Sequence, residues 1–358
     1  MAVRKLRSEA LPAATRNRRP PQNRRSDANA SRVDPWADST FLRPLRGEAP
    51  AERIAMIFRS IFLLIGLLLT TATSALARDR DVDVAPDISL HVIDSGPEDA
   101  RLPTLVLIPG WGFAGSIWSA QIDAFDDHRR VIAIDPRSQG DSTKTADGYT
   151  PEQRADDLHV LLGKLGVRRF VLVGWSQGVQ DVAAYVLRHG TAPVDGVVLV
   201  DSMISGGAAS VAASPGMAAQ QLGLLPILAA SPRDYTEGLM RAVITRPLAP
   251  AELDALISEA LKTPTAIRAA MLVADMFGAD RSAAVAKIDR PALIIASPRS
   301  SELAAQRDMA AKIAGSEFHI VDNAGHAVFF DQPARFNALL GEFLAHLSST
   351  APRPAGAG

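Results

Sequence analysis

The chain has 358 residues, which is enough for one α/β core of about 200–250 residues with additional segments around it. Hydrophobic residues make up 47% and charged residues 22%. The 38 Lys and Arg nearly balance the 39 Asp and Glu, so the composition argues against a nucleic-acid partner. Cysteine is absent, which excludes disulfides, thiolate metal sites and a cysteine nucleophile.

Residues 1–55 form a basic segment without a sustained apolar period. They hold twelve Lys and Arg against six Asp and Glu, and they are rich in Pro, Ser, Asn and Ala. This composition is typical of disordered chain. The segment is either a basic arm for a membrane or nucleic acid, or a leader that precedes the true translation start at Met56. We favour the leader, and the choice between Met1 and Met56 stays open.

Residues 56–77 have the parts of a secretory signal peptide. Arg59 lies in a short basic region, Ile61–Leu69 is an uncharged apolar stretch, and the tripeptide ALA at 75–77 matches a cleavage site. Cleavage would make Arg78 the first residue of a periplasmic or secreted protein, which meets the membrane only during export. The alternative is a membrane anchor, because the same segment could nearly span a bilayer. The polar Thr and Ser residues before the cleavage site favour the signal peptide.

From Arg78 onward, short apolar runs alternate with amphipathic segments. The predicted strands are Ile88–Ile93, Thr104–Ile108, Val131–Ile134, Phe170–Val173, Val197–Val200, Ala292–Ile295 and Phe318–Val321. The predicted helices between and after them are Ile117–Phe125, Pro151–Leu165, Gln177–Leu187 and Gln332–Leu347. This alternation predicts an α/β fold with a doubly wound, mostly parallel sheet, built from residues 78–201 and 286–347.

Residues 202–285 interrupt the alternation. They are rich in Ala, Leu and Met, they contain no strand pattern, and they are longer than an ordinary crossover. The predicted helices here are Met217–Leu224, Tyr235–Val243, Pro250–Leu261 and Ala266–Phe277. We therefore expect an inserted helical cap over the carboxyl edge of the sheet. Residues 348–358, rich in Pro, Ala and Gly, are predicted to be a flexible tail.

The pentapeptide GWSQG at 174–178 follows a predicted strand and opens a predicted helix. In this context the G-x-S-x-G pattern predicts a nucleophile elbow, a tight turn that presents the serine hydroxyl. The helix N-terminus behind it favours negative charge that develops during the reaction. A glycine-rich turn can also be purely structural, but the strand–turn–helix context predicts that Ser176 is a catalytic nucleophile.

A serine hydroxyl needs a base to become a good nucleophile. Six of the seven histidines lie in predicted strands, helices or polar connections and are interpreted as structural or solvated: His91, His128, His159, His189, His319 and His346. His326 differs, because it follows the last predicted strand. Its loop should overhang the same carboxyl edge of the sheet as Ser176. We predict that His326 is the general base.

With these residues in place, positions 87–347 resemble the α/β-hydrolase superfamily. Four motifs occur in the expected order: LIPGWG at 107–112, DPRSQGDS at 135–142, the elbow at 174–178, and GH at 325–326 followed by DQPARF at 331–336. The resemblance implies the α/β-hydrolase fold and serine esterase-like chemistry. It also implies that the backbone N–H groups of Trp111 and Gln177 form the oxyanion hole.

The resemblance leaves two positions for the acid of the triad. Superfamily members commonly carry it after the strand predicted at Ala292–Ile295, but Ser300 stands where Asp is expected. Glu302 is the nearest carboxylate in that loop. Other members carry the acid at the end of the preceding strand, where this chain has Asp201. We predict Asp201 as the acid, with Glu302 as the alternative and the lack of any functional acid as a third interpretation.

These residues predict a serine hydrolase that cleaves a small or medium carboxylic ester through an acyl-enzyme on Ser176. The sequence contains neither metal-ligand spacing nor a glycine-rich nucleotide fingerprint, so we expect no metal and no cofactor. Acyl transfer, lactone opening and carbon–carbon bond hydrolysis on the same site remain alternatives. A non-catalytic ligand-binding protein of the same fold is a further one. The sequence indicates neither the particular ester nor the oligomeric state.

Overall fold

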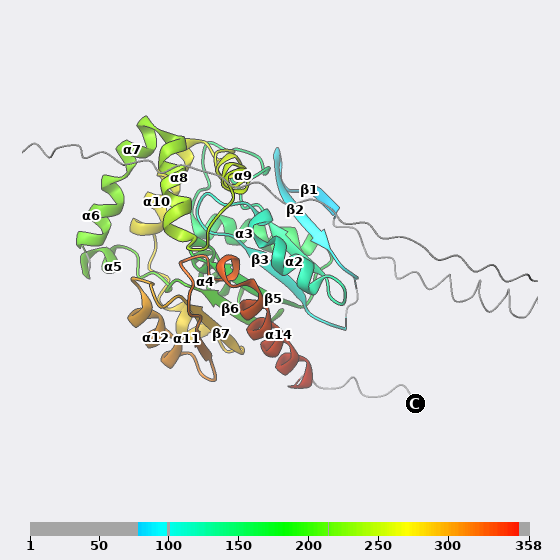
Figure 1. Ribbon diagram of the computed structural model, residues 1–358. Coiled ribbons are helices and arrows are strands. Elements are labelled where there is room, and N and C mark those ends of the chain that lie inside the picture. The colour runs from blue at the N-terminus through cyan, green and yellow to red at the C-terminus, as the bar shows by residue number, and fades with distance from the viewer. Residues whose placement is uncertain (1–77, 99–100, 214, 351–358) are drawn as a thin grey trace, which may run out of the picture. The chain divides into compact units, whose positions relative to one another are not determined.

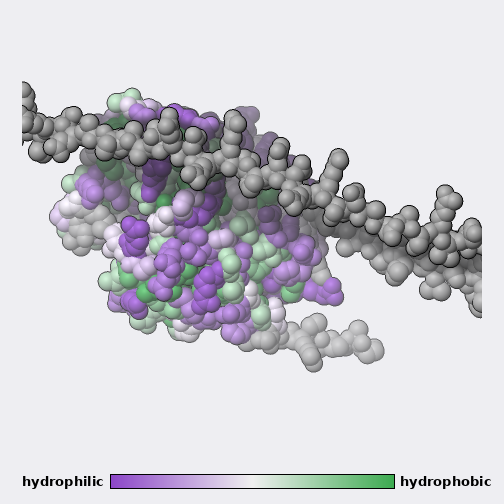
Figure 2. All heavy atoms as spheres, in the orientation of Figure 1, coloured by the Kyte–Doolittle hydropathy of each residue, from purple (hydrophilic) through white to green (hydrophobic). Residues whose placement is uncertain are grey.

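The computed structural model describes residues 78–98, 101–213 and 215–350. The predicted leader and signal peptide at 1–77, and residues 351–358 of the predicted tail, lie outside the described residues. Within the described part, no helix combines the length and the apolar character needed to cross a membrane. On the face shown in Figure 2, polar residues are interspersed with smaller apolar areas.

A mostly parallel sheet of eight strands forms the centre of the fold, in the order β1-β2-β4-β3-β5-β6-β7-β8. The strands are β1 Arg78–Ala85, β2 Ile88–Ser95, β3 Thr104–Ile108, β4 Val131–Ile134, β5 Phe170–Trp175, β6 Val194–Val200, β7 Ala292–Ala296 and β8 Glu317–Ile320. Strand β2 runs antiparallel to both of its neighbours, and the other pairs from β4 to β8 are parallel. This architecture confirms the predicted sheet.

Helices cover both faces of the sheet, so its central strands are buried on each side. Their bounds are η1 Gly115–Trp118, α2 Ser119–Phe125, α3 Pro151–Lys164, α4 Gln177–His189, α12 Leu303–Lys312, α13 Val328–Asp331 and α14 Pro333–Thr350. Leu105 and Leu107 of β3 pack in one buried cluster with α2 and α14. Val106 and Ile108 face the opposite way and pack with α3 and α4. Burial on both faces explains why these strands are continuous apolar runs in the sequence.

Seven helices separate β6 from β7 along the described chain: α5 Ala208–Ala213, α6 Pro215–Gly223, α7 Leu225–Ala230, α8 Pro232–Val243, α9 Pro250–Ala260, α10 Thr265–Phe277 and α11 Ala284–Lys287. Helices α5 to α10 lie together, apart from α12 and α14, and are green to yellow in Figure 1. Met240 of α8 and Leu253 of α9 belong to the same buried cluster as β3 and α14. These helices therefore pack onto the sheet domain rather than standing alone.

Strand β1 is the largest difference from the sequence prediction, which placed no strand before Ile88. Its sequence RDRDVDVA is charged at its first four positions and again at Asp83, and Val84 is its one buried residue. It pairs only with β2, at the edge of the sheet. An edge strand keeps one side in solvent, so it does not need the apolar run by which the central strands were recognised.

Candidate active site

Ser176 occupies the turn between β5 and α4, with φ 56° and ψ −117°. A positive φ is strained for a residue with a side chain, so the surrounding structure must hold it. A Cβ on Gly174 would lie 2.3 Å from the backbone oxygen of Gly178, and one on Gly178 would lie 2.6 Å from that of Ile108. Only glycine allows this close crossing of strand and helix. The resulting turn holds Ser176 in the wall of a cavity.

His326 lies in the loop that follows β8. The Asp331 carboxylate accepts the Gly325 N–H at 2.7 Å, which fixes the loop just before the histidine. The indole N–H of Trp175 donates to the His326 backbone oxygen at 2.8 Å, and the centres of the two rings are 5.3 Å apart. Because Trp175 directly precedes Ser176, this contact ties the histidine loop to the nucleophile turn.

Asp201 directly follows β6, and its carboxylate contacts His326. Its Oδ2 lies 2.8 Å from Nδ1 of His326, and its side chain is fully buried. Its Oδ1 accepts the backbone N–H of Ser297 at 2.8 Å, which fixes the carboxylate plane. The contact at Nδ1 leaves Nε2 as the ring nitrogen available to a nucleophile. The structure thus brings together Asp201 and His326, as the sequence analysis expected.

Glu302, the alternative acid, is placed differently. It is the residue before the first turn of α12, and its Oε2 accepts the Ser202 hydroxyl at 3.2 Å and the Met203 N–H at 3.0 Å. Among the described residues, its carboxylate makes no contact with His326. Ser300 accepts a hydrogen bond from the Gln306 amide at 2.9 Å. The later loop therefore supports Asp201 through the Ser297 N–H instead of supplying the acid.

The predicted oxyanion residues flank Ser176. A Cβ on Gly110 would lie 3.1 Å from the Ser176 Cβ, so the loop after β3 passes directly beside Ser176. In that loop the Gly112 N–H donates to the Gln139 side chain. Within the described chain, the backbone N–H groups of Trp111 and Gln177 have no acceptor. Gln177 is also the first residue of α4, where the helix favours negative charge.

Arg268 of α10 secures the oxyanion loop from the cap, and the sequence analysis did not single it out. Its backbone oxygen accepts the Trp111 indole N–H at 2.8 Å, and its guanidinium lies 4.7 Å from the Trp111 ring centre. The side chain is fully buried, and burial lowers the pKa of Arg268 to about 10. Its Nη1 donates to the Thr236 hydroxyl at 2.7 Å. The available signal was an arginine in a helix whose other residues, apart from Thr265 and Asp275, are apolar.

A buried charge network lies under the elbow. The Arg154 guanidinium is 2.8 Å from Asp181 of α4 and 3.3 Å from Asp275 of α10. The Gln177 side-chain amide donates to Asp275 as well. Burial raises the pKa of Asp275, and it raises that of Asp181 to about 6. Two carboxylates thus share one guanidinium, and the network connects the cap to the start of α4. The sequence analysis missed it.

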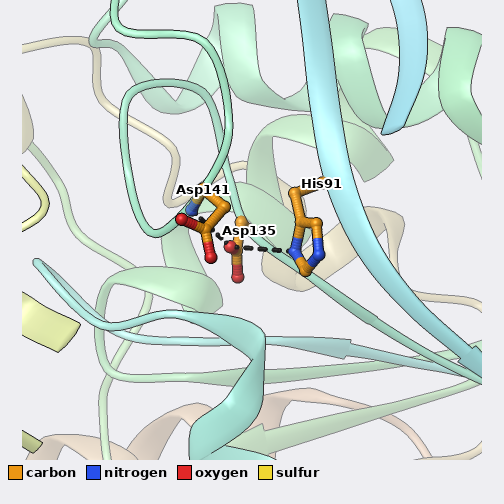
Figure 3. Close-up of side chains that lie close together, drawn as sticks. All are labelled: His91, Asp135 and Asp141. Carbon is orange, nitrogen blue, oxygen red and sulfur yellow. Dashed lines mark hydrogen bonds and ion pairs between the residues drawn. The ribbon is translucent and has the colours of Figure 1, made fainter. Parts of the chain in front are cut away.

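A second cluster, His91, Asp135 and Asp141, brings metal-type ligand atoms within 4.8 Å of one another (Figure 3). The Asp135 oxygens already accept the Gly115 N–H at 2.6 Å and the Asp141 N–H at 2.7 Å. His91 Nδ1 lies 3.2 Å from Asp135, and this hydrogen bond raises the His91 pKa. The Lys262 ammonium lies 2.6 Å from Asp141. These contacts indicate that the cluster stabilises the turn after β4. The positive charge beside its carboxylates comes from Lys262.

Such a fold with such a site is that of an α/β hydrolase. The sequence pattern of the alpha/beta hydrolase family matches residues 105–339. The chain belongs to this family. The match begins in β3 and ends in α14, so it includes the elbow, the cap and the histidine loop.

Similar proteins include enzymes that act on esters. A bifunctional esterase/perhydrolase from Acinetobacter calcoaceticus is 38% identical over 117 residues, which are 32% of this chain and 42% of the relative. A non-heme chloroperoxidase from Kitasatospora aureofaciens is 41% identical over 100 residues, 28% of this chain and 36% of the relative. The chain therefore spans less than half the length of these relatives. A thermophilic esterase from Thermogutta terrifontis shares the fold, with a TM-score of 0.65, 22% identity, and coverage of 76% of this chain and 100% of the esterase.

Proposed function

We propose that the protein is a serine hydrolase that cleaves a small or medium carboxylic ester without a cofactor, through an acyl-enzyme on Ser176. The observation that carries the proposal is the 2.8 Å contact between Nδ1 of His326 and the buried carboxylate of Asp201. A carboxylate at Nδ1 holds the neutral imidazole with its proton on that nitrogen. The unprotonated Nε2 is then free to accept the Ser176 proton.

In the first half of the proposed reaction, the Ser176 hydroxyl attacks the ester carbonyl carbon while Nε2 of His326 takes its proton. The carbonyl oxygen becomes an oxyanion, and the N–H groups of Trp111 and Gln177 stabilise it. The tetrahedral intermediate then breaks its bond to the alcohol oxygen. His326 returns the proton to that oxygen, and the alcohol leaves the acyl-enzyme.

In the second half, water attacks the acyl-enzyme carbonyl while His326 accepts a proton from it. The same two N–H groups stabilise the second oxyanion. The bond to the Ser176 oxygen breaks, the serine regains its proton, and the carboxylic acid is released. Asp201 stabilises the imidazolium that forms in each half.

The direct test is active-site labelling combined with an ester panel. We expect a fluorophosphonate probe to modify the protein at Ser176, located by peptide mass spectrometry, and short-chain esters to be hydrolysed. Prior labelling should abolish the hydrolysis. A folded protein that binds esters but takes no label and releases no acid would favour the non-catalytic alternative.

Acyl transfer is a second candidate, because a relative is named as both esterase and perhydrolase. The same acyl-enzyme serves transfer if an acceptor other than water attacks it. Product analysis with an added alcohol or amine distinguishes the two reactions. Transfer would appear as a new ester or amide that grows at the expense of free acid. Lactone and diketone substrates test the remaining alternatives.

We also propose that the protein is exported to the periplasm or beyond the cell after cleavage behind Ala77. The apolar stretch Ile61–Leu69, followed by the tripeptide ALA at 75–77, supports this boundary.

N-terminal sequencing of the exported protein tests the boundary, and we expect the mature chain to begin at Arg78. The fraction in which it is found, periplasm or medium, then gives its location. A mature chain that stays in the membrane fraction with Ile61–Leu69 attached would contradict cleavage and favour the anchor.

A further inference from the structure

The cavity beside Ser176 has an unusually acidic wall. It measures about 220 Å³ and lies between the elbow, the cap and the start of α12. Two carboxylates, Asp275 and Glu302, line it, together with several serine hydroxyls and glutamine amides. None of the described residues that line it is Lys, Arg or His. The one cationic side chain that pairs with these carboxylates among the described residues, Arg154 beside Asp275, is outside the lining of the cavity.

Of the two carboxylates in this wall, Glu302 is the one whose negative charge no cationic side chain of the described residues balances. Both of its hydrogen bonds come from neutral donors, the Ser202 hydroxyl and the Met203 N–H, and both end on Oε2. Among the described residues, no cationic side chain pairs with it and Oε1 accepts no hydrogen bond. A partly buried carboxylate in this state favours a ligand that brings positive charge and N–H donors.

Gln177 adds an acceptor that lacks a donor. A carboxylate accepts hydrogen bonds only, so the Gln177 nitrogen must be the atom that faces Asp275. The carbonyl oxygen Oε1 is then left over. It is buried and has no partner in the described structure, while the side chain lines the cavity. A buried acceptor without a donor is costly, and its partial negative charge adds to the negative character of this wall.

Asp275 gives the wall further negative character. Its one cationic contact, the Arg154 guanidinium, is shared with Asp181. One direct ion-pair partner therefore serves two carboxylates, and the Arg281 guanidinium adds a more distant positive charge that is itself paired with Glu152. Burial raises the pKa of both carboxyl groups, against the opposite effect of the Arg154 and Arg281 guanidiniums.

From this wall we infer that the ester cleaved at Ser176 carries an ammonium group, held by the Glu302 carboxylate. The inference rests on the proposed ester hydrolysis and names its substrate class. An ammonium group supplies a positive charge and three N–H donors to a site that offers acceptors. A purely alkyl ester of the same size would desolvate Glu302 without replacing its contacts with water. A carboxylate-bearing ester would add repulsion.

Three ethyl esters of matched length test this inference: ethyl 4-aminobutyrate, ethyl pentanoate and monoethyl glutarate. Each kcat/KM, followed by acid release at constant pH, is divided by the ester's rate of hydrolysis by hydroxide, which removes differences in intrinsic reactivity. We expect the ammonium ester to exceed the neutral ester by about tenfold or more, as expected for one partly buried charge pair. The anionic ester should be slowest.

The Glu302→Gln variant should lower the ratio of ammonium to neutral ester by about tenfold. Glu237→Gln is the matched control, because Glu237 is partly exposed, pairs with Arg241 one helical turn away and is outside the cavity. The dependence of kcat/KM on ionic strength tests the inference without a variant. With the wild-type protein, added salt should lower kcat/KM for the ammonium ester and leave kcat/KM for ethyl pentanoate nearly constant.

Equal or greater kcat/KM for ethyl pentanoate, in a protein that takes the fluorophosphonate label, would overturn the ammonium inference and leave the proposed function standing. If a folded Glu302→Gln variant keeps the wild-type ratio of kcat/KM for the ammonium ester to that for ethyl pentanoate, Glu302 does not bind the ammonium group. A protein that takes no label and cleaves none of the three esters would overturn the proposed function, and the inference with it.

Discussion

Ser176→Ala should abolish fluorophosphonate labelling and lower kcat for ester hydrolysis by roughly 10⁶-fold, as for a serine that forms the covalent intermediate. The expectation rests on geometry, because Ser176 is the serine held at the strand–helix turn where Gly174 and Gly178 allow the close crossing. His326→Gln should lower kcat by a similar factor, since the members of a triad act as a unit. Steady-state rates and mass-spectrometric labelling measure both variants.

The matched control for the nucleophile is Ser282→Ala, which removes an exposed serine between α10 and α11. It should keep wild-type labelling and turnover. Circular dichroism and thermal unfolding should show that all three variants are folded. Wild-type hydrolysis by folded Ser176→Ala or His326→Gln would rule out the acyl-enzyme mechanism.

Asp201→Asn should lower kcat by roughly 10⁴-fold, by analogy with other triads in which an amide replaces the aspartate. The Oδ1 atom of Asp201 accepts the Ser297 N–H, so an asparagine oxygen would take that place and its NH₂ would face His326. Nδ1 of His326 would then have to accept a hydrogen bond, which moves its proton to Nε2. A protonated Nε2 cannot act as the base for Ser176. The variant's kcat for ethyl pentanoate, at a pH near neutrality, measures the effect.

Two further variants make the Asp201 result decisive. Asp308→Asn is the matched control, because Asp308 is exposed and pairs with Lys312 on α12. It should keep the wild-type kcat. Glu302→Gln tests the rival acid on the same neutral ester, and its loss of kcat should be far smaller than that of Asp201→Asn. A damaged Glu302→Gln beside an active Asp201→Asn would transfer the acid's role to Glu302.

Some elements of the fold and of the candidate site can be predicted from short-range sequence patterns alone. A strand buried on both faces must be apolar at every position, so β3 and β4 are recognisable at their true bounds. The elbow is equally local, since its two glycines are required by contacts within one strand–turn–helix unit and with the neighbouring strand β3. The position of His326 follows from one long-range rule, that the carboxyl ends of parallel strands meet at one edge of the sheet.

Other features depend on which segments the fold brings together. Asp201 and Glu302 are both acceptable acids along the chain, and the packing of β6 beside β7 decides that Asp201 meets His326 while Glu302 meets Met203. Arg268 and Asp275 stand in an apolar helix without any local motif, and they acquire partners only when α10 packs over the elbow. Hydrophobic periodicity reports which face of an element is buried. It carries no information on which charged groups from distant segments will share that burial, and the polar wall of the cavity is built from such groups.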